Sequence, residues 1–363
     1  MVKQHKQVKK KSNMALYIAV GVIIVLFAVF GFVFAKPHKQ AGVQIQQAQT
    51  KTAQNDTRTS TSQNDTQTLN SDTQTDYKNF AKYKFSYKYK LAVSGHLNSL
   101  DFTVMIPQKE AGKQYFEKLK INKKPTKLYK ENGNLKAEFS YSDIDNQDIN
   151  LEISGIAYLR TYDIKTAKAL KLKPSGTEDL SRYLKSEPLI ESDDAEIIEI
   201  AQKIQGNTRE EILDNMYQYI QNHMTYQRIK DIGAKAALKQ GFGKCSEYAA
   251  IMTALCRAKN IPARVISGNF AREHDSQHTW VEVYYDDYGW VTYDPTFSPV
   301  RVTTRDEDGN VVKTEYRYET SHDNIHYIKS ANDVFSSFVF HYRKPTGSNG
   351  GFSVTETINI RKL

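Results

Sequence analysis

Three residues in the second half of the chain could together perform nucleophilic catalysis, namely Cys245, His278 and Asp294. A cysteine attacks a carbonyl carbon as its thiolate, it needs a neighbouring base, and the base needs an acceptor that orients its other nitrogen. Each residue alone also has a structural explanation, because buried cysteines are often inert and an Asp before Pro often forms a turn. In combination they fit a Cys, His, Asp version of the catalytic triad.

The candidate nucleophile falls at the start of a predicted helix. Gly241-Phe-Gly-Lys-Cys245 leads into a nearly all-apolar stretch that stops at Asn260. At a helix N-terminus, unpaired backbone N–H groups and the positive end of the helix dipole favour a thiolate. Cys256 is 11 residues further along, about 16 Å on the helix axis, so the two cysteines cannot form a disulfide. We expect Cys256 in the core.

His278 begins one strand of a predicted β-hairpin, and Asp294 ends the other. Side chains alternate between the two faces of a strand, so the loop length decides whether these two side chains can meet. A loop of two or four residues would place Asp294 opposite Val281, on the wrong face. We therefore predict an odd loop length or a bulge, which places Asp294 near Trp280 and within hydrogen-bonding reach of His278.

With these motifs in view, the sequence resembles the transglutaminase-like superfamily, whose core shares the papain-like arrangement of cysteine enzymes. The matching segments follow the family's Cys, His, Asp order and are Gly243-Lys-Cys245, Ile261-Pro-Ala-Arg264, His278-Thr-Trp-Val-Glu282 and Gly289-Trp290 through Asp294-Pro-Thr296. The resemblance implies that Cys245 is the nucleophile, His278 the acid/base and Asp294 the orienting acid. Asn260 stands where the family commonly has Gly, and Asn also tolerates a left-handed helix cap.

By this resemblance, the thiolate attacks a carboxamide or peptide carbonyl of a protein or peptide substrate. An amine entering the thioester gives transamidation and water gives hydrolysis, and the sequence leaves both open. The N–H of Cys245 and one upstream side chain should hold the oxyanion, with Tyr226 and Gln240 as candidates. We expect no cofactor and no metal. His274 and His278 are four residues apart, as metal ligands on a helix can be, but residues 268–277 predict a polar loop that leads into a strand.

The segment before the folded part predicts attachment to a membrane. Residues 14–35 carry no charge and number 22, about 33 Å as a helix, which is enough to span a bilayer once. The basic tail 1–13 places the N-terminus in the cytosol and the folded part outside. A cleaved signal peptide is the alternative, although its apolar region is usually shorter. Residues 36–76 lack aromatic side chains and predict a disordered tether.

Two folded regions follow, a β-rich domain at 77–181 and a transglutaminase-like domain at 182–363. In the first, aromatic residues alternate with lysines from Lys82 to Lys90, which predicts half-buried antiparallel strands. The second begins with helices, one of them opened by the capping box Thr208-Arg-Glu-Glu211. The resulting fold class is α+β, with the cysteine-bearing helix packed on an antiparallel sheet.

Composition narrows the possible functions. Two cysteines among 363 residues exclude a disulfide scaffold. The net charge is +9, but five of these charges lie within residues 1–13 and leave +4 for the rest, so we expect no nucleic-acid partner. A rival to the enzyme is a catalytically silent binding module, which would use the cleft and the Lys82 to Lys90 face to hold an anionic cell-surface polymer. The complete triad favours the enzyme.

Overall fold

The computed structural model describes residues 67–68, 79–172, 174, 178–271, 277–297, 300–305, 311–317, 327–331, 340–343 and 349–363. The predicted tail and membrane span lie outside these residues, as does most of the predicted tether. Within the described part of the chain, no helix is long and apolar enough to cross a membrane. Gln67–Thr68 forms a short strand, β1, paired with β4, so the expected disorder of 36–76 does not hold for these two residues.

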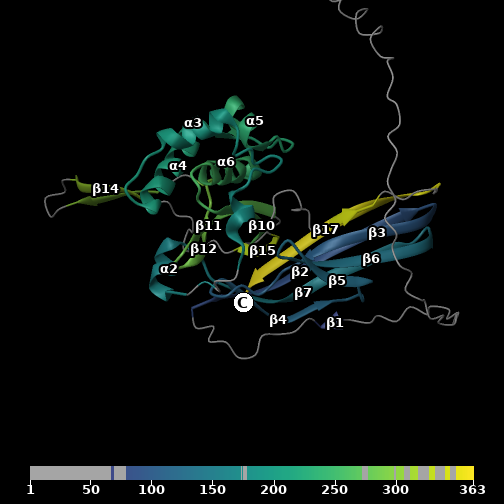
Figure 1. The fold of residues 1–363 in the computed structure, drawn as a ribbon. Helices are drawn as coiled ribbons and strands as arrows, with labels where there is room; N and C mark the ends of the chain where they lie inside the picture. The colour runs from purple at the N-terminus through teal and green to yellow at the C-terminus, as the bar shows by residue number, and fades with distance from the viewer. Residues whose placement is uncertain are drawn as a thin grey trace, which may run out of the picture. The chain divides into compact units, whose positions relative to one another are not determined.

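The β-rich region consists of two antiparallel sheets, with strand orders β1-β4-β7-β2-β17 and β16-β3-β6-β5 (Figure 1). The strands are β2 (Ala81–Ser94), β3 (His96–Ile106), β4 (Gln114–Ile121), β5 (Lys127–Glu131), β6 (Asn134–Asp145), β7 (Asp148–Leu159), β16 (Phe340–Tyr342) and β17 (Gly351–Lys362). The aromatic residues of β2 are buried between the sheets, and most of its lysines are exposed, as the alternation predicted. Asn132 and Gly133 both have positive φ and form the turn between β5 and β6, because Asn and Gly tolerate this conformation.

The division at residue 181 that the sequence suggested does not follow the strand pairing. β17 pairs with β2 from Gly351↔Ser94 to Lys362↔Tyr83, and β16 pairs with β3. In Figure 1, β17 runs beside β2 at the edge of its sheet. The C-terminal strands therefore complete the sheets of the β-rich region, although they follow the other region in sequence. Pairing covers the exposed edge of β2.

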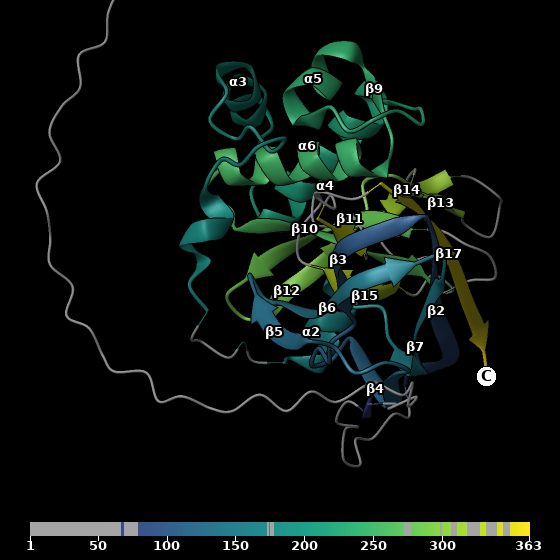
Figure 2. The same cartoon turned by 90° about the vertical axis from the view of Figure 1, so that its right-hand side faces the viewer.

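The second region packs helices on a four-stranded antiparallel sheet of order β12-β11-β10-β15. Its elements are α2 (Ile164–Leu170), the 3₁₀ helix η2 (Leu180–Leu184), α3 (Ala195–Lys203), α4 (Arg209–His223), β8 (Thr225–Tyr226), α5 (Gly233–Gln240), β9 (Phe242–Gly243), α6 (Cys245–Ala258), β10 (Ala263–Phe270), β11 (Gln277–Tyr285), β12 (Gly289–Tyr293) and β15 (Tyr327–Ala331). β13 (Val300–Arg305) and β14 (Val311–Arg317) form a separate hairpin. Figure 2 shows α6 between this sheet and α3 and α5, which agrees with the predicted α+β core.

Candidate active site

Cys245 is the first residue of α6, and the preceding backbone fits tightly against the helix. The side chain of Glu247 is buried and accepts hydrogen bonds from the N–H groups of Lys244 and Ile232, each at 3.1 Å. A Cβ at Gly243 would lie 2.5 Å from the Cβ of Glu247, so glycine is required there. The nucleophile candidate is thus held at a well-anchored helix N-terminus.

The β11–β12 hairpin has the register that the sequence predicts. Tyr285 pairs with Gly289, so the loop has three residues, and Val281 pairs with Tyr293. Gly289 has φ +71°, the left-handed conformation that three-residue hairpin loops need after their turn. The next position sets Asp294 beside Trp280, on the face that carries His278. The Nε2 of His278 lies 2.7 Å from Oδ2 of Asp294.

The side chains of His278 and Cys245 are in hydrogen-bonding contact, and each shifts the pKa of the other. Burial alone would raise the pKa of Cys245, but the hydrogen bond and charge of His278 and the N–H of Thr279 lower it below its usual value. Burial alone would lower the pKa of His278, but the charge of Asp294, its hydrogen bond and the contact with Cys245 raise it to about 9. Because Nε2 of His278 faces Asp294, the other ring nitrogen, Nδ1, is the one available to the thiol of Cys245. Both shifts favour thiolate and imidazolium.

Aromatic rings surround the imidazole of His278. Phe270 stacks on it with centroids 4.3 Å apart and an angle of 26°, and Trp280 lies nearly parallel at 6.2 Å. Phe297 contacts it at 5.6 Å. The imidazole is 5% exposed, so these rings limit both its rotation and the access of water. The sequence analysis did not place Phe270 or Phe297 at the site, because neither residue lies in the motifs that carry the cysteine, the histidine or the aspartate.

Helix α4 holds the loop that carries Asp294. The Asp294 carboxylate is fully buried, and its Oδ1 accepts the N–H of Thr296 at 3.1 Å. The hydroxyl of Tyr217 donates to the carbonyl of Asp294 at 2.9 Å, and the side-chain amide of Gln221 donates to the carbonyl of Pro295. The sequence predicted this helix but not its contact with Asp294, since the contact joins residues 77 positions apart.

The thiol opens onto a cavity of about 790 Å³. Of the two oxyanion candidates, Tyr226 lines this cavity and is 50% exposed. Gln240 ends α5, is exposed, and is not among the residues that line the cavity. Glu356 of β17 does line it, and its Oε2 accepts a hydrogen bond from Nε2 of Gln277 at 2.9 Å. The C-terminal strand therefore contributes to the cleft, which the sequence did not indicate.

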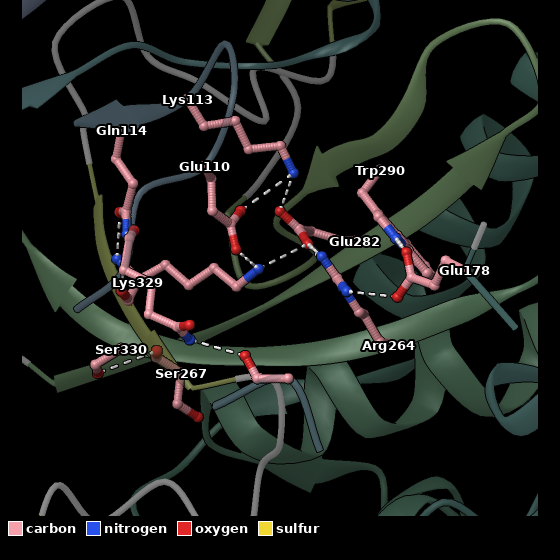
Figure 3. Close-up of polar contacts among 12 residues, drawn as sticks. Glu110, Lys113, Gln114, Glu178, Arg264, Ser267, Glu282, Trp290, Lys329 and Ser330 are labelled. Atoms are coloured by element: carbon pink, nitrogen blue, oxygen red, sulfur yellow. Dashed lines mark hydrogen bonds and ion pairs between the residues drawn. The ribbon is translucent and has the colours of Figure 1, made fainter. Parts of the chain in front are cut away.

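A second ionic cluster lies further along β11 (Figure 3). The buried carboxylate of Glu282 accepts hydrogen bonds from Nε and Nη2 of Arg264 at 2.9 and 2.7 Å. The ammonium of Lys113 also contacts Glu282, and that of Lys329 lies 3.4 Å from it. Lys329 bridges to Glu110, which lies 3.7 Å from Lys113. We call these five residues the Glu282 cluster.

The Glu282 cluster joins the two regions of the molecule, because Glu110 and Lys113 lie just before β4 while the other three members lie on β10, β11 and β15. The guanidinium of Arg264 also stacks on Trp290 at 4.1 Å. Arg264 and Glu282 lie in two of the motifs recognised in the sequence, and their β10–β11 pairing could have been inferred from them. Their partners from the β-rich region could not.

The remaining expectations concern cysteines and metals. Cys256 is fully buried, its Sγ lies 3.8 Å from Sδ of Met216, and both cysteines are free thiols. Burial raises the pKa of Cys256 to about 12. Asn260 has φ +57°, the left-handed cap expected after α6. His274 lies outside the described residues, and among those described no three His, Cys, Asp or Glu side chains form a metal-binding group.

Comparison with known proteins was made on sequence and on structure. Residues 198–295 match the family model described as the transglutaminase-like superfamily. The chain is 32% identical over 82 residues to the uncharacterized protein YebA of Bacillus subtilis, and 33% identical over 87 residues to a protein-glutamine gamma-glutamyltransferase of Pseudomonas aeruginosa. These alignments cover 18% and 20% of this chain, and only 11% and 13% of the two relatives.

A solved structure shows a similar fold over a larger part of the chain. The crystal structure of a candidate cysteine protease from Cytophaga hutchinsonii superposes with a TM-score of 0.54 at 16% identity. The superposition covers 78% of this chain and 91% of that one. The likeness concerns the fold and extends beyond the segment that the family model matches.

Proposed function

We propose that this chain, whose residues 198–295 match the model of the transglutaminase-like superfamily, is a cysteine enzyme acting on amide bonds of proteins or peptides. The observation that carries the proposal is the arrangement of the half-buried Cys245 with the buried His278 and Asp294 at the cleft. The 2.7 Å contact between His278 and Asp294 and the lowered pKa of Cys245 are what an activated thiol needs. A silent binding module would have no use for an activated thiol.

The first half of the reaction forms a thioester. The Cys245 thiolate bonds to the carbonyl carbon, and the negative charge moves to the carbonyl oxygen. The N–H of Cys245 and the hydroxyl of Tyr226 donate hydrogen bonds to that oxygen. The C–N bond then breaks, and the proton on Nδ1 of His278 passes to the departing nitrogen. Ammonia leaves when the substrate is a glutamine side chain, and an amine leaves when it is a peptide.

The second half restores the thiolate. Neutral His278 takes a proton from an incoming amine or water as it attacks the thioester, and the sulfur leaves as thiolate beside the imidazolium. Asp294 keeps the ring oriented throughout and stabilises its charge. An amine acceptor produces a crosslink and water produces an acid. The named function of the Pseudomonas aeruginosa relative supports testing the amine route first.

We also propose that the enzyme is anchored in the cell membrane by residues 14–35, with the cytosolic tail before them and the folded regions outside. The support is the uncharged 22-residue run with lysines before it. Protease protection of the full chain in intact cells and in lysed cells tests this proposal. Digestion of the folded regions in intact cells supports it, and protection of those regions contradicts it.

Incorporation of a fluorescent primary amine into a glutamine peptide tests the activity, with ammonia release and peptide cleavage measured in parallel. Cys245→Ala should abolish all three signals because no thioester can form. Cys256→Ala is the matched control, since it removes the buried thiol at a distance from the cleft, and it should retain the activity. If neither a crosslink nor a hydrolysis product forms, and no acyl-enzyme is trapped with the wild-type chain, the enzyme proposal fails.

A further inference from the structure

The outer face of the five-stranded sheet is hollowed into a groove of about 1120 Å³, distinct from the active-site cleft. Five basic side chains from three of its strands line it and are all exposed: Lys84, Lys88, Lys118, Lys120 and Arg361. Glu152 is the carboxylate side chain among the lining residues. We call this hollow the basic groove. Its lining side chains carry four more positive charges than negative ones.

A β-bulge in β4 turns two of these lysines outward. The pairing of β4 with β7 shifts between Glu117 and Lys120, and Lys118 has φ +53°. Before the bulge Phe116 faces the core, and after it Leu119 and Ile121 do. The change of phase leaves Lys118 and Lys120 on the outer face; in a regular strand they would share the inward face of Phe116. A left-handed lysine is unfavourable locally, so the lysines are placed here at a conformational cost.

The floor of the groove is built from short polar side chains. The register sets Lys120 beside Ser154, Ser154 beside Ser86, and Ser86 beside Asn359. This row crosses four strands. Long basic side chains stand on either side of the row, so the sheet forms a trough whose floor carries hydroxyl and amide groups. Such groups donate hydrogen bonds to phosphate or carboxylate oxygens.

Two of the basic side chains of the groove face each other across neighbouring strands. Lys84 lies directly opposite Arg361 on the neighbouring strand, an arrangement of like charges that destabilises a sheet. Among the described residues, none of the five basic groups forms an ion pair. The lysines at the two ends of the same strand differ, because Lys82 lies over the ring of Tyr158 and Lys90 pairs with Asp148 at 2.8 Å.

We propose that the basic groove binds a linear polyanion, a chain of repeated phosphate or carboxylate groups. Glu152 lies opposite Lys88 in the strand register, but among the described residues it forms no ion pair with Lys88. Five closely spaced cations against this one lining carboxylate side chain favour a ligand that brings several negative charges at once. A single-stranded nucleic acid fits less well because its bases stack on exposed aromatic rings, and Phe85, the aromatic residue of the lining, is 1% exposed. A flat bilayer surface could not reach the polar floor.

Strand β17 places the basic groove next to the active-site cleft. Glu356 and Ile358 line the cleft, and Asn359 and Arg361 line the groove, while Ile358 belongs to both linings. Consecutive residues of a strand point to opposite faces, so a single strand separates the two hollows. A polymer in the groove would hold the cleft close to amides that the polymer or its surroundings carry. The binding site itself does not depend on the proposed catalytic activity.

Fluorescence anisotropy with labelled inorganic polyphosphate and labelled poly-glutamate tests the proposal on the full chain in a non-ionic detergent. The groove variant is Lys84→Glu with Lys120→Glu. The matched control is Lys124→Glu with Lys130→Glu, which makes the same change of net charge at exposed positions outside the lining. We expect the groove variant to bind at least one polyanion roughly tenfold more weakly, and the control to change less than about twofold.

The two probes separate phosphate from carboxylate recognition, and binding of either one that depends on the groove supports the proposal. Affinity should also fall as salt rises, because exposed charges are screened. Circular dichroism checks that the variants fold, and the salt titration of the wild-type chain does not depend on any variant. Equal losses in both variants, no binding of either probe, or tighter binding of a single-stranded oligonucleotide than of polyphosphate of equal charge would overturn the proposal. So would binding to anionic vesicles without binding to either polymer.

Discussion

His278 and Glu282 lie four residues apart on the same face of β11, and each is a buried ionisable group in contact with an opposite charge. Their surroundings differ in one respect. His278 has a single carboxylate behind it and a thiol in front of it, at the cleft. Glu282 has three cations around it and no exposed group within its cluster.

The difference decides what a proton can do at each place. Burial would raise the pKa of Glu282, but the charges of Lys113, Lys329 and Arg264 lower it far below the usual value, so this carboxylate stays ionised. At His278 the proton can pass between the ring and the reacting atoms. The Glu282 carboxylate, surrounded by cations, therefore suits a structural role, and His278, which contacts both a carboxylate and a thiol, suits the proton transfer that we propose for the triad.

The largest expected effect is a loss of catalytic rate on substitution of Asp294, which holds the imidazole of His278. Asp294→Asn should lower the rate of amine incorporation by roughly two to four orders of magnitude, because the imidazole loses its orienting charge and its preferred tautomer. The amide has nearly the same shape, so the folded structure should persist. The measurement is kcat/KM for the glutamine peptide, with circular dichroism as the control. A fully active Asp294→Asn enzyme would refute the triad.

A substitution in the Glu282 cluster should lower the stability of the fold and leave the catalytic rate unchanged. Glu282→Gln leaves three cations without their central carboxylate, and removing one partner of a buried ionic group costs about 3–5 kcal/mol. The free energy of unfolding, measured by urea denaturation, should fall by that amount. The residual folded enzyme should keep its catalytic constant, since Glu282 does not touch the thiol.

A matched control for that substitution is Glu199→Gln, which removes an exposed ion pair with Lys203 and should change stability very little. The pH dependence gives a second check. The folded pKa of Glu282 lies below the unfolded value near 4.5, so its contribution is present above that pH and is lost as pH falls further. Wild type should therefore lose stability in acid more steeply than Glu282→Gln, and parallel curves would contradict the role given to Glu282.

The sequence could predict the local part of this arrangement and not the long-range part. The place of His278 and Asp294 on one hairpin followed from strand alternation and from a loop that ends in Gly289. The partners of Glu282 from the β-rich region had no comparable signal. The pairing of Ser94 with Gly351 joins residues 257 positions apart, and alternation within a strand does not say which other strand it meets.

The sequence also could not rank the two oxyanion candidates, because their distance from Cys245 depends on how the chain folds. Tyr226 and Gln240 both precede Cys245 in the chain, and spacing alone could not rank them. The parallel pairing of Tyr226 with Gly243 brings the tyrosine to the nucleophile, while Gln240 ends its helix in solvent. The aromatic enclosure of His278 was also hidden, because Phe270 and Phe297 come from separate segments that meet only in the folded chain.

A smaller effect is expected in the pH dependence of activity, which the pKa values of Cys245 and His278 should set. Activity needs thiolate and imidazolium together, so it should rise with pH through the lowered pKa of Cys245 and fall above the raised pKa of His278 near 9. One unit above that limit, at pH 10, kcat/KM should be about tenfold below its plateau. Alkylation by iodoacetamide at pH 6 should modify Cys245 and spare Cys256, as mass spectrometry can show. Modification of both at equal rates would contradict the assigned surroundings.

The smallest expected effect tests the ring that stacks on the imidazole. The face of Phe270 lies 4.3 Å from His278, and an aromatic face stabilises a nearby cation by about 0.5–1 kcal/mol. Phe270→Leu should therefore destabilise the imidazolium and lower the basic limit of the pH profile by roughly 0.4 to 0.7 units. Phe297→Leu, at 5.6 Å and a less parallel angle, should shift it less. Glu282→Gln, four residues along the strand, should leave the limit within about 0.2 units because its own charge is neutralised by the cations beside it. If Phe270→Leu lowers the rate at every pH without moving the limit, the ring positions His278 by packing and does not stabilise its charge.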